Sequence, residues 1–129
     1  MTDVNKKLWA YRRNEARMES KEYELESKLQ AYVMKRLRQC KEIKVFKTIK
    51  SNEAGVSDII ACAGGRYIAI ELKVKKNKTT PLQKNFLDEI HKAGGIAFEA
   101  RTWREVKDVF KLAGYNLDEY FENEVSSGF

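Results

Sequence analysis

The sequence predicts an α/β fold in which helices flank a mixed β-sheet, with the core order αβββαβα. Three patterns lead to this prediction: an amphipathic helical segment, then two apolar runs on either side of Gly64-Gly65, then a capped helix that leads into a further strand. A hairpin followed by a helix and another strand implies a mixed sheet covered by helices.

The first part of the chain combines a basic extension with an amphipathic helix. Residues 1–20 are polar and charged, and we expect them to be helical or only partly ordered. Apolar residues recur at helical spacing across residues 21–39, which predicts a helix with one buried face. A first strand is expected at residues 44–49, followed by a loop at residues 51–55.

A tight β-hairpin is predicted next, with strands at residues 56–63 and 67–74. The Gly64-Gly65 pair between two apolar runs is a strong signal for a two-residue loop with a primed turn. In such a loop Ala63 faces Arg66, and every further pair of facing residues keeps the same sum of residue numbers. The register of the whole hairpin is therefore fixed by its turn.

This register places two carboxylates opposite each other. Asp58 faces Glu71, with Cβ atoms roughly 4.5–5.5 Å apart, and Lys73 shares the face of Glu71 because side chains alternate along a strand. Facing like charges repel unless a cation lies between them, and Mg²⁺ takes one or two carboxylates as ligands. The alternative is a solvated polar face on an edge hairpin. The other face of the second strand is expected to pack on a core, because it carries Ile68, Ile70, Leu72 and Val74.

The C-terminal half begins with a cationic loop at residues 75–79. Thr80 fits an N-cap, Pro81 the first helical position and Gln83 the third position of a capping box. The helix ends at Gly94-Gly95.

A fourth strand is expected at residues 96–100, and Thr102 with Glu105 caps a last helix. The acidic tail is expected to fray. The predicted organisation is a basic extension over residues 1–20, a domain over residues 21–112 and an acidic tail over residues 113–129.

Composition narrows the function classes. The 129 residues suffice for one domain with a proper core, and the apolar fraction of 43% with 34% charged residues is typical of a globular protein. No apolar run approaches the ~20 residues of a membrane span, and the N-terminus lacks the apolar core of a signal peptide, so a cytoplasmic location is expected. The isolated Cys40 and Cys62 and the single His91 argue against a zinc site and against histidine-based catalysis.

Charge is distributed unevenly along the chain, whose net charge is +6. Residues 1–50 hold 14 Lys and Arg against 7 Asp and Glu, whereas residues 113–129 hold none against 4. A basic domain with an acidic tail suits a polyanionic partner such as nucleic acid, although many basic surfaces are merely solvated.

Several short motifs together resemble the PD-(D/E)xK nuclease superfamily and, within it, the VRR-Nuc (virus-type replication-repair nuclease) family. The helix that opens these domains is similar to residues 26–30, and the paired glycines after the later helix are similar to residues 92–97. Ser57 stands where the family usually has proline, which changes the strand entry and leaves the chemistry intact. The motifs that carry the resemblance are Gly55-Val56-Ser57-Asp58, Ala69-Ile70-Glu71-Leu72-Lys73 and Pro81-Leu82-Gln83.

The resemblance implies a restriction-endonuclease-like fold and a metal site for Mg²⁺ or Mn²⁺. Asp58 and Glu71 would bind the metal together with the backbone carbonyl of Leu72, and Glu26 would complete the shell directly or through water. Surface salt bridging is the alternative for the first two acids. For Glu26 the alternative is an ordinary acidic residue on a helix, and Glu22 and Glu24 compete with it for the place in the metal shell.

The same resemblance assigns catalytic roles to Lys73 and Gln83. Lys73 would stabilise negative charge at the scissile phosphate and help orient or deprotonate the attacking water. Gln83 would position Lys73 or the water, although the capping box explains it without catalysis. A solvated loop is the alternative for the residues that follow the site and are assigned to DNA phosphates: Lys75, Lys76, Lys78 and Thr79.

The resulting hypothesis is a Mg²⁺- or Mn²⁺-dependent DNA endonuclease that hydrolyses phosphodiester bonds. The resemblance further implies phage-encoded enzymes that act as homodimers on branched DNA such as Holliday junctions. Trp9, Tyr11 and Tyr23 would anchor the dimer. The rivals are a general DNA nickase or exonuclease and a non-cleaving DNA-binding module of the same fold.

Overall fold

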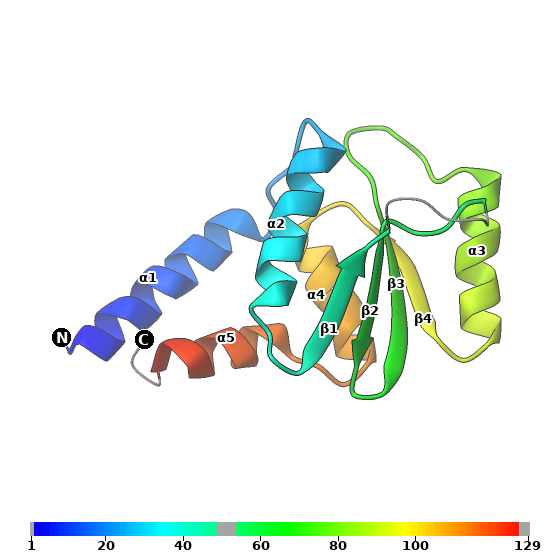
Figure 1. The fold of residues 1–129 in the computed structure, drawn as a ribbon. Helices are drawn as coiled ribbons and strands as arrows, with labels where there is room; N and C mark the ends of the chain where they lie inside the picture. Colours follow the sequence, from blue (N-terminus) through cyan, green and yellow to red (C-terminus); the bar gives the residue numbers. More distant parts are fainter. Residues whose placement is uncertain (1, 49–53, 127–129) are drawn as a thin grey trace.

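The computed structural model describes residues 2–48 and 54–126 (Figure 1). The expected core order αβββαβα is confirmed, with a further helix added at each end. The helices are α1 (Asp3–Met18), α2 (Glu26–Arg38), α3 (Pro81–Lys92), α4 (Trp103–Leu112) and α5 (Leu117–Ser126). The strands are β1 (Ile43–Lys47), β2 (Ile59–Ala63), β3 (Arg66–Leu72) and β4 (Ile96–Ala100).

The sheet is mixed, as predicted, and its order is β1-β2-β3-β4. β2 pairs antiparallel with both β1 and β3, whereas β3 and β4 run parallel because α3 connects them. The hairpin register is also confirmed, with Ala63 opposite Arg66 and Ile59 opposite Ile70. Gly64 and Gly65 have φ of 59° and 76°, the positive values that a type I′ turn requires at both positions.

The strands of the hairpin are shorter than expected: β2 begins at Ile59 and β3 ends at Leu72, and the last pair of the hairpin ladder is Ile59 with Ile70. Immediately beyond this pair, the Asp58 side chain replaces a backbone partner: its Oδ2 accepts a hydrogen bond of 2.9 Å from the Leu72 N–H. Asp58 and Lys73 therefore lie just past the strand ends, next to β2 and β3.

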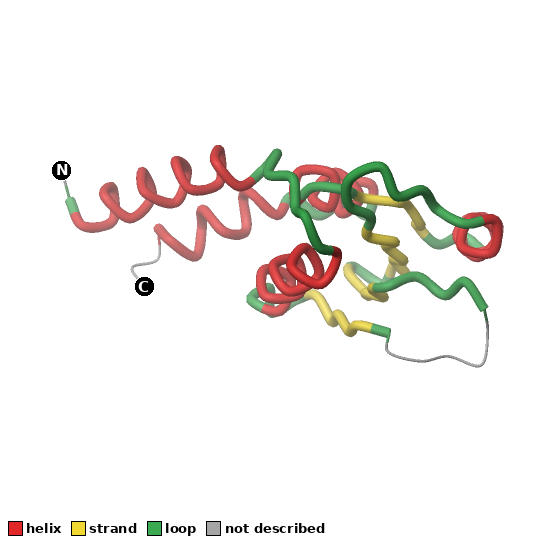
Figure 2. The backbone as a smooth tube through the Cα atoms, turned by 90° about the horizontal axis from the view of Figure 1, so that it is seen from above, coloured by secondary structure: helices red, strands yellow, loops and turns green. Residues whose placement is uncertain are grey.

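Helices cover the sheet on both faces, as Figure 2 shows from above. The main core lies between one face and helices α2 and α4, and includes the four residues expected there: Ile68, Ile70, Leu72 and Val74. Helix α3 covers the opposite face with Phe86 and Leu87, which pack on Ile60, Ala69 and Ala97. The site carboxylates belong to this second face.

The expectation of a frayed acidic tail is wrong for the residues described. Helix α5 packs beside α1, and the pair extends away from the sheet (Figures 1 and 2). Leu117 and Phe121, one helical turn apart, are buried in the main core, and the Phe121 ring lies 6.3 Å from that of Tyr11. None of the described helices is long and apolar enough to cross a membrane.

A buried ion-pair network fastens α1 and α5 to the domain. Lys107 is only 3% exposed, and its Nζ lies 2.6 Å from Glu19 Oε1, 2.7 Å from Asp118 Oδ1 and 3.4 Å from Glu15 Oε2. Glu15 also accepts hydrogen bonds from Arg36 (2.6 Å) and the Trp103 indole (3.0 Å). Burial alone would lower the pKa of Lys107, but the hydrogen bonds to Asp118 and Glu19 raise it, so the ammonium stays charged.

Lys107→Met should lower the free energy of unfolding by about 3 kcal/mol, because breaking a buried ion pair leaves carboxylates without their counter-charge. Urea denaturation would measure the loss. Arg104→Met is the matched control, since it removes a cation from Glu19 at the surface, where a pair contributes about 1 kcal/mol or less. Equal losses in the two variants would contradict the assignment of the network as a structural fastening.

Candidate active site

Glu71 is the most buried member of the candidate site, at 2% exposed. Its Oε1 accepts a hydrogen bond of 2.9 Å from Gln83 Nε2 and lies 3.6 Å from Lys73 Nζ. Its Oε2 is buried and, among the described residues, has no hydrogen-bond partner. A buried carboxylate oxygen without a donor is costly, so this atom fits the position of a ligand to a cation.

The electrostatics of Glu71 agree with that fit. Burial, reinforced by the neighbouring charge of Asp58, raises the pKa of Glu71 to about 8, although Lys73 opposes the shift. A divalent cation between the two carboxylates would remove both causes, because it replaces lost hydration and offsets their repulsion. Carboxylate oxygens are also the ligands that Mg²⁺ prefers. The residues present therefore fit a hard divalent metal.

Lys73 is 8% exposed and lies at the end of β3. Its backbone N–H donates to the Ala100 carbonyl at 3.1 Å, which continues the pairing of β3 with β4 past the strand end. The alternative of a solvated face on an edge hairpin is wrong, because β2 and β3 are the inner strands and both Glu71 and Lys73 are buried.

Gln83 completes the capping box and also points its amide at the site, whereas its positioning of Lys73 or the water stays a prediction. Its backbone N–H donates to Thr80 Oγ1 and its Oε1 accepts from the Thr80 N–H, completing the capping box. The same side chain donates from Nε2 to Glu71. The cap thus fixes the rotamer that points the amide at the site.

Gly55 allows the loop before Asp58 to approach the start of α3. Its φ is 80°, and a Cβ atom there would lie 2.4 Å from the Leu82 carbonyl oxygen. Only glycine permits this contact. The approach brings the Asp58 loop and Gln83, which are distant in sequence, to one site.

Glu26 is not brought to the two carboxylates in the described part of the chain, where no hydrogen bond or ion pair joins it to Asp58 or Glu71. It begins α2, which covers the face of the sheet opposite to Glu71. A role for Glu26 in the metal shell, like that of the Leu72 carbonyl, stays a prediction.

The basic loop after the site contains both engaged and unengaged groups. Lys75, with a positive φ of 53°, forms a 2.6 Å ion pair with Glu24, and the Thr79 hydroxyl donates to Glu99. Lys76 and Lys78 are exposed, and the described residues offer neither an ion pair. Among the four residues predicted to contact DNA phosphates, Lys76 and Lys78 are the two whose positive charge is not offset by a carboxylate of the described residues.

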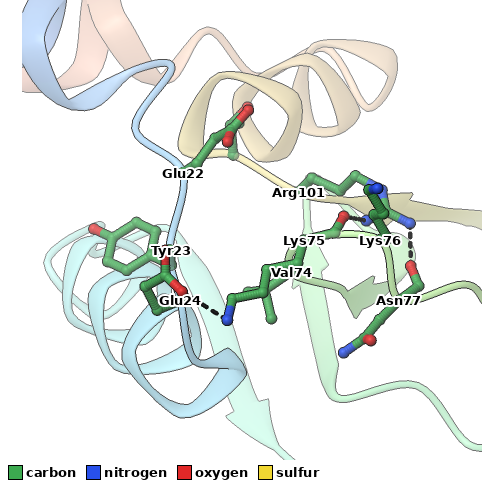
Figure 3. Close-up of a pocket in the computed structure, with 9 residues that line it drawn as sticks. Glu22, Tyr23, Glu24, Val74, Lys75, Lys76, Asn77 and Arg101 are labelled. Atoms are coloured by element: carbon green, nitrogen blue, oxygen red, sulfur yellow. Dashed lines mark hydrogen bonds and ion pairs between the residues drawn. The ribbon is translucent and has the colours of Figure 1, made fainter.

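Arg101 and Glu99 hold this loop in place, and sequence reasoning missed both. Arg101 donates to the backbone carbonyls of Lys75 (2.7 Å) and Asn77 (Figure 3). Its Nη2 also lies 2.7 Å from Glu99 Oε1. Glu99 is the register partner of Glu71 across β3 and β4, so the fastening begins beside the site. The available signal was Glu99 itself, an acid within the otherwise apolar run of residues 96–100. Glu71 gave the same kind of signal in its own strand.

Arg101→Gln should raise the KM for DNA by about three- to ten-fold and leave kcat nearly unchanged, because it disorders the loop whose lysines are predicted to contact phosphates. Steady-state cleavage kinetics would measure the split. Arg104→Gln removes a surface arginine of α4 and serves as the control. A fall in kcat at unchanged KM would contradict this positioning role.

A second group of carboxylates has metal-like spacing but lies elsewhere. Oxygens of Glu15, Glu19 and Asp118 fall within 4.8 Å of one another. The Lys107 ammonium contacts all three at 2.6–3.4 Å and occupies the position that a cation would take. The metal expectation therefore belongs to Asp58 and Glu71.

The fold and the site together define a nuclease-type α/β domain: a mixed sheet whose inner hairpin presents paired carboxylates and a lysine. The model of the VRR-NUC domain family matches residues 3–103, and the chain belongs to this family. The family uses divalent metals in general, in agreement with the carboxylates found here.

Two known proteins are similar to this chain. The Holliday junction resolvase RecU of Shouchella clausii (strain KSM-K16) is 30% identical over 87 residues, which cover 62% of this chain. The match spans 42% of that relative, less than half of its length. A solved structure of a VRR-NUC domain superposes with a TM-score of 0.54 at 24% identity, covering 70% of this chain and 95% of its own, and shows the shared fold.

Proposed function

We propose that the protein is a Mg²⁺- or Mn²⁺-dependent endodeoxyribonuclease that hydrolyses phosphodiester bonds and selects branched DNA such as Holliday junctions. The observation that supports it most is the buried Glu71 Oε2, which lacks a donor in the described residues and lies in a carboxyl group next to Asp58 and Lys73. Membership of the VRR-NUC family supports a nuclease.

In the proposed mechanism, each side chain has a separate task. Asp58 and Glu71 would hold the metal, which would supply Lewis-acid chemistry to the phosphate and activate the attacking water. Gln83 keeps Glu71 in its rotamer, since it is itself locked by the helix cap. The Lys73 ammonium, close to the carboxylates and shielded from solvent, donates to the phosphoryl oxygen that gains negative charge.

Selectivity for branched DNA and assembly as a homodimer are supported by the resolvase relative and by geometry. One domain carries one such site, whereas a four-way junction needs two coordinated cuts. A two-fold symmetric dimer would supply the two sites. Of the three aromatic residues expected at the interface, Trp9 is 55% exposed, with Arg13 over its ring. Tyr11 packs against the main core, where burial raises the pKa of its hydroxyl, and Tyr23 packs on Tyr32. The proposed interface therefore centres on Trp9.

The deciding experiment compares cleavage of linear duplex, single-stranded, flap and four-way-junction DNA, each with Mg²⁺, Mn²⁺ or EDTA. We expect metal-dependent cleavage that is fastest on the junction, together with a dimer in light scattering at micromolar concentration. A monomer that nicks linear duplex and junction equally would favour the general nickase. Binding without cleavage in every metal would favour the non-cleaving module.

A further inference from the structure

A groove of about 340 Å³ runs between α2 and the end of β1. Its α2 wall is one helical stripe that includes Gln30, Lys35 and Arg38, and Lys47 closes it from β1. The residues that line it include three cations and no acid. Such a concentration of one sign of charge in a hollow attracts anions.

The three cations of the groove are exposed and uncompensated. In the part of the chain that the structure describes, none of Lys35, Arg38 and Lys47 takes part in an ion pair. By contrast, Arg36, which lies between Lys35 and Arg38 in the sequence, forms an ion pair with the buried Glu15.

The cavity beside the basic loop provides the contrast. That cavity, of about 650 Å³, is lined by Lys75, Lys76 and Arg101 but also by Glu22 and Glu24 (Figure 3). Its cations are therefore partly neutralised. The α2/β1 groove has the larger excess of positive charge, although the sequence pointed to the loop.

The groove also adjoins the candidate active site. Lys47 is the register partner of Ile59, the residue after Asp58. Thr48, the residue after the end of β1, donates its backbone N–H to the Asp58 carbonyl at 2.9 Å. Lys47 thus lies at the same end of the sheet as Asp58, with its groove on the α2 face and the site carboxylates on the α3 face.

We propose that the α2/β1 groove binds the phosphate backbone of duplex DNA on the side of the site away from the basic loop. This inference rests on the proposed nuclease function and adds a second contact surface to it. Lys and Arg side chains with amide and hydroxyl donors beside them are the groups that bind phosphates. The only large apolar residue of the groove, Met34, is buried, so the surface lacks the aromatic or apolar anchor of a protein interface.

The test measures binding of a fluorescently labelled duplex in EDTA, by anisotropy, as a function of salt. The K35Q/R38Q variant should bind about ten-fold more weakly near 100 mM salt, and the slope of log K against log salt should become shallower by about 2. Metal-dependent cleavage at saturating DNA should stay at the wild-type rate. K47Q, which changes the other wall, should weaken binding in the same direction and tests the groove independently of the fold of α2.

The control variant K6Q/K92Q removes two exposed lysine charges from α1 and α3 that form no ion pair in the described residues. An equal loss of affinity in the control would reduce the effect to net charge and overturn the inference. A wild-type protein that binds and cuts DNA, beside groove variants that bind equally well, would overturn the inference and leave the proposed function standing. A wild type that neither binds nor cuts would overturn both. A changed molar mass of the groove variants in light scattering would make the groove a contact between copies and also overturn it.

Discussion

Asp58→Asn and Glu71→Gln should each lower metal-dependent cleavage of DNA by about a thousand-fold or more, because each removes a charge on which binding of the proposed metal depends. Both substitutions keep the shape of the side chain. The amide introduced by Asp58→Asn retains an oxygen that can accept from the Leu72 N–H, so the end of the hairpin stays closed. Cleavage assays on the preferred DNA substrate would measure the loss. Wild-type rates in either variant would rule out the metal site proposed here.

The same variants have a readout that does not depend on activity. Mg²⁺ at saturating concentration should raise the Tm of the wild type and leave that of both variants unchanged, because a ligand stabilises only the state that binds it. In the metal-free protein the raised pKa of Glu71 means that folding favours its protonated form. Metal-free stability should therefore decline as the pH rises from about 4.5 to about 8, and Glu71→Gln should remove the decline.

Lys73→Met should lower kcat by about a hundred- to a thousand-fold and change the Kd for DNA by less than about three-fold. Its ammonium is proposed to act on charge that develops only in the transition state, where a single donor contributes this much. Methionine preserves the volume of the largely buried side chain. Single-turnover cleavage would report kcat, and anisotropy in EDTA the affinity.

Lys76→Met is the matched control for Lys73. Lys76 follows the site, is exposed, and lines the cavity of Figure 3. Its substitution should weaken binding modestly, flatten the salt dependence by about 1 and leave kcat unchanged. A Lys73 variant that cuts normally and only binds less tightly would make Lys73 a phosphate clamp rather than part of the catalytic set.

Local patterns in the sequence were sufficient for the fold and for the pairing of the two acids. The turn at Gly64-Gly65 fixes the register of the hairpin, and the period of two then determines which residues face each other. The capping box at Thr80 and Gln83 is equally local, because its partners lie within one helical turn. Both kinds of signal act over few residues, and the sequence displays them directly.

Features that depend on distant segments could not be predicted in this way. The acidic tail was expected to fray, yet α5 packs against α1, and its Leu117 and Phe121 are buried in the main core. The Arg101 fastening exists only because β4 lies parallel to β3 and brings Glu99 beside Glu71. The uncompensated positive charge of the α2/β1 groove also could not be predicted from the sequence, because it depends on which lysines and arginines form ion pairs in the folded chain.

The sequence by itself thus determined the element order, the hairpin register and the identity of the paired carboxylates, because alternation and turn chemistry are short-range. Only the tertiary structure decided that Glu71 is buried with a free oxygen, that Gln83 serves the cap and the site at once, and which lysines stay unpaired. Burial and charge compensation are sums over neighbours from the whole chain, so they are defined only after the chain has folded.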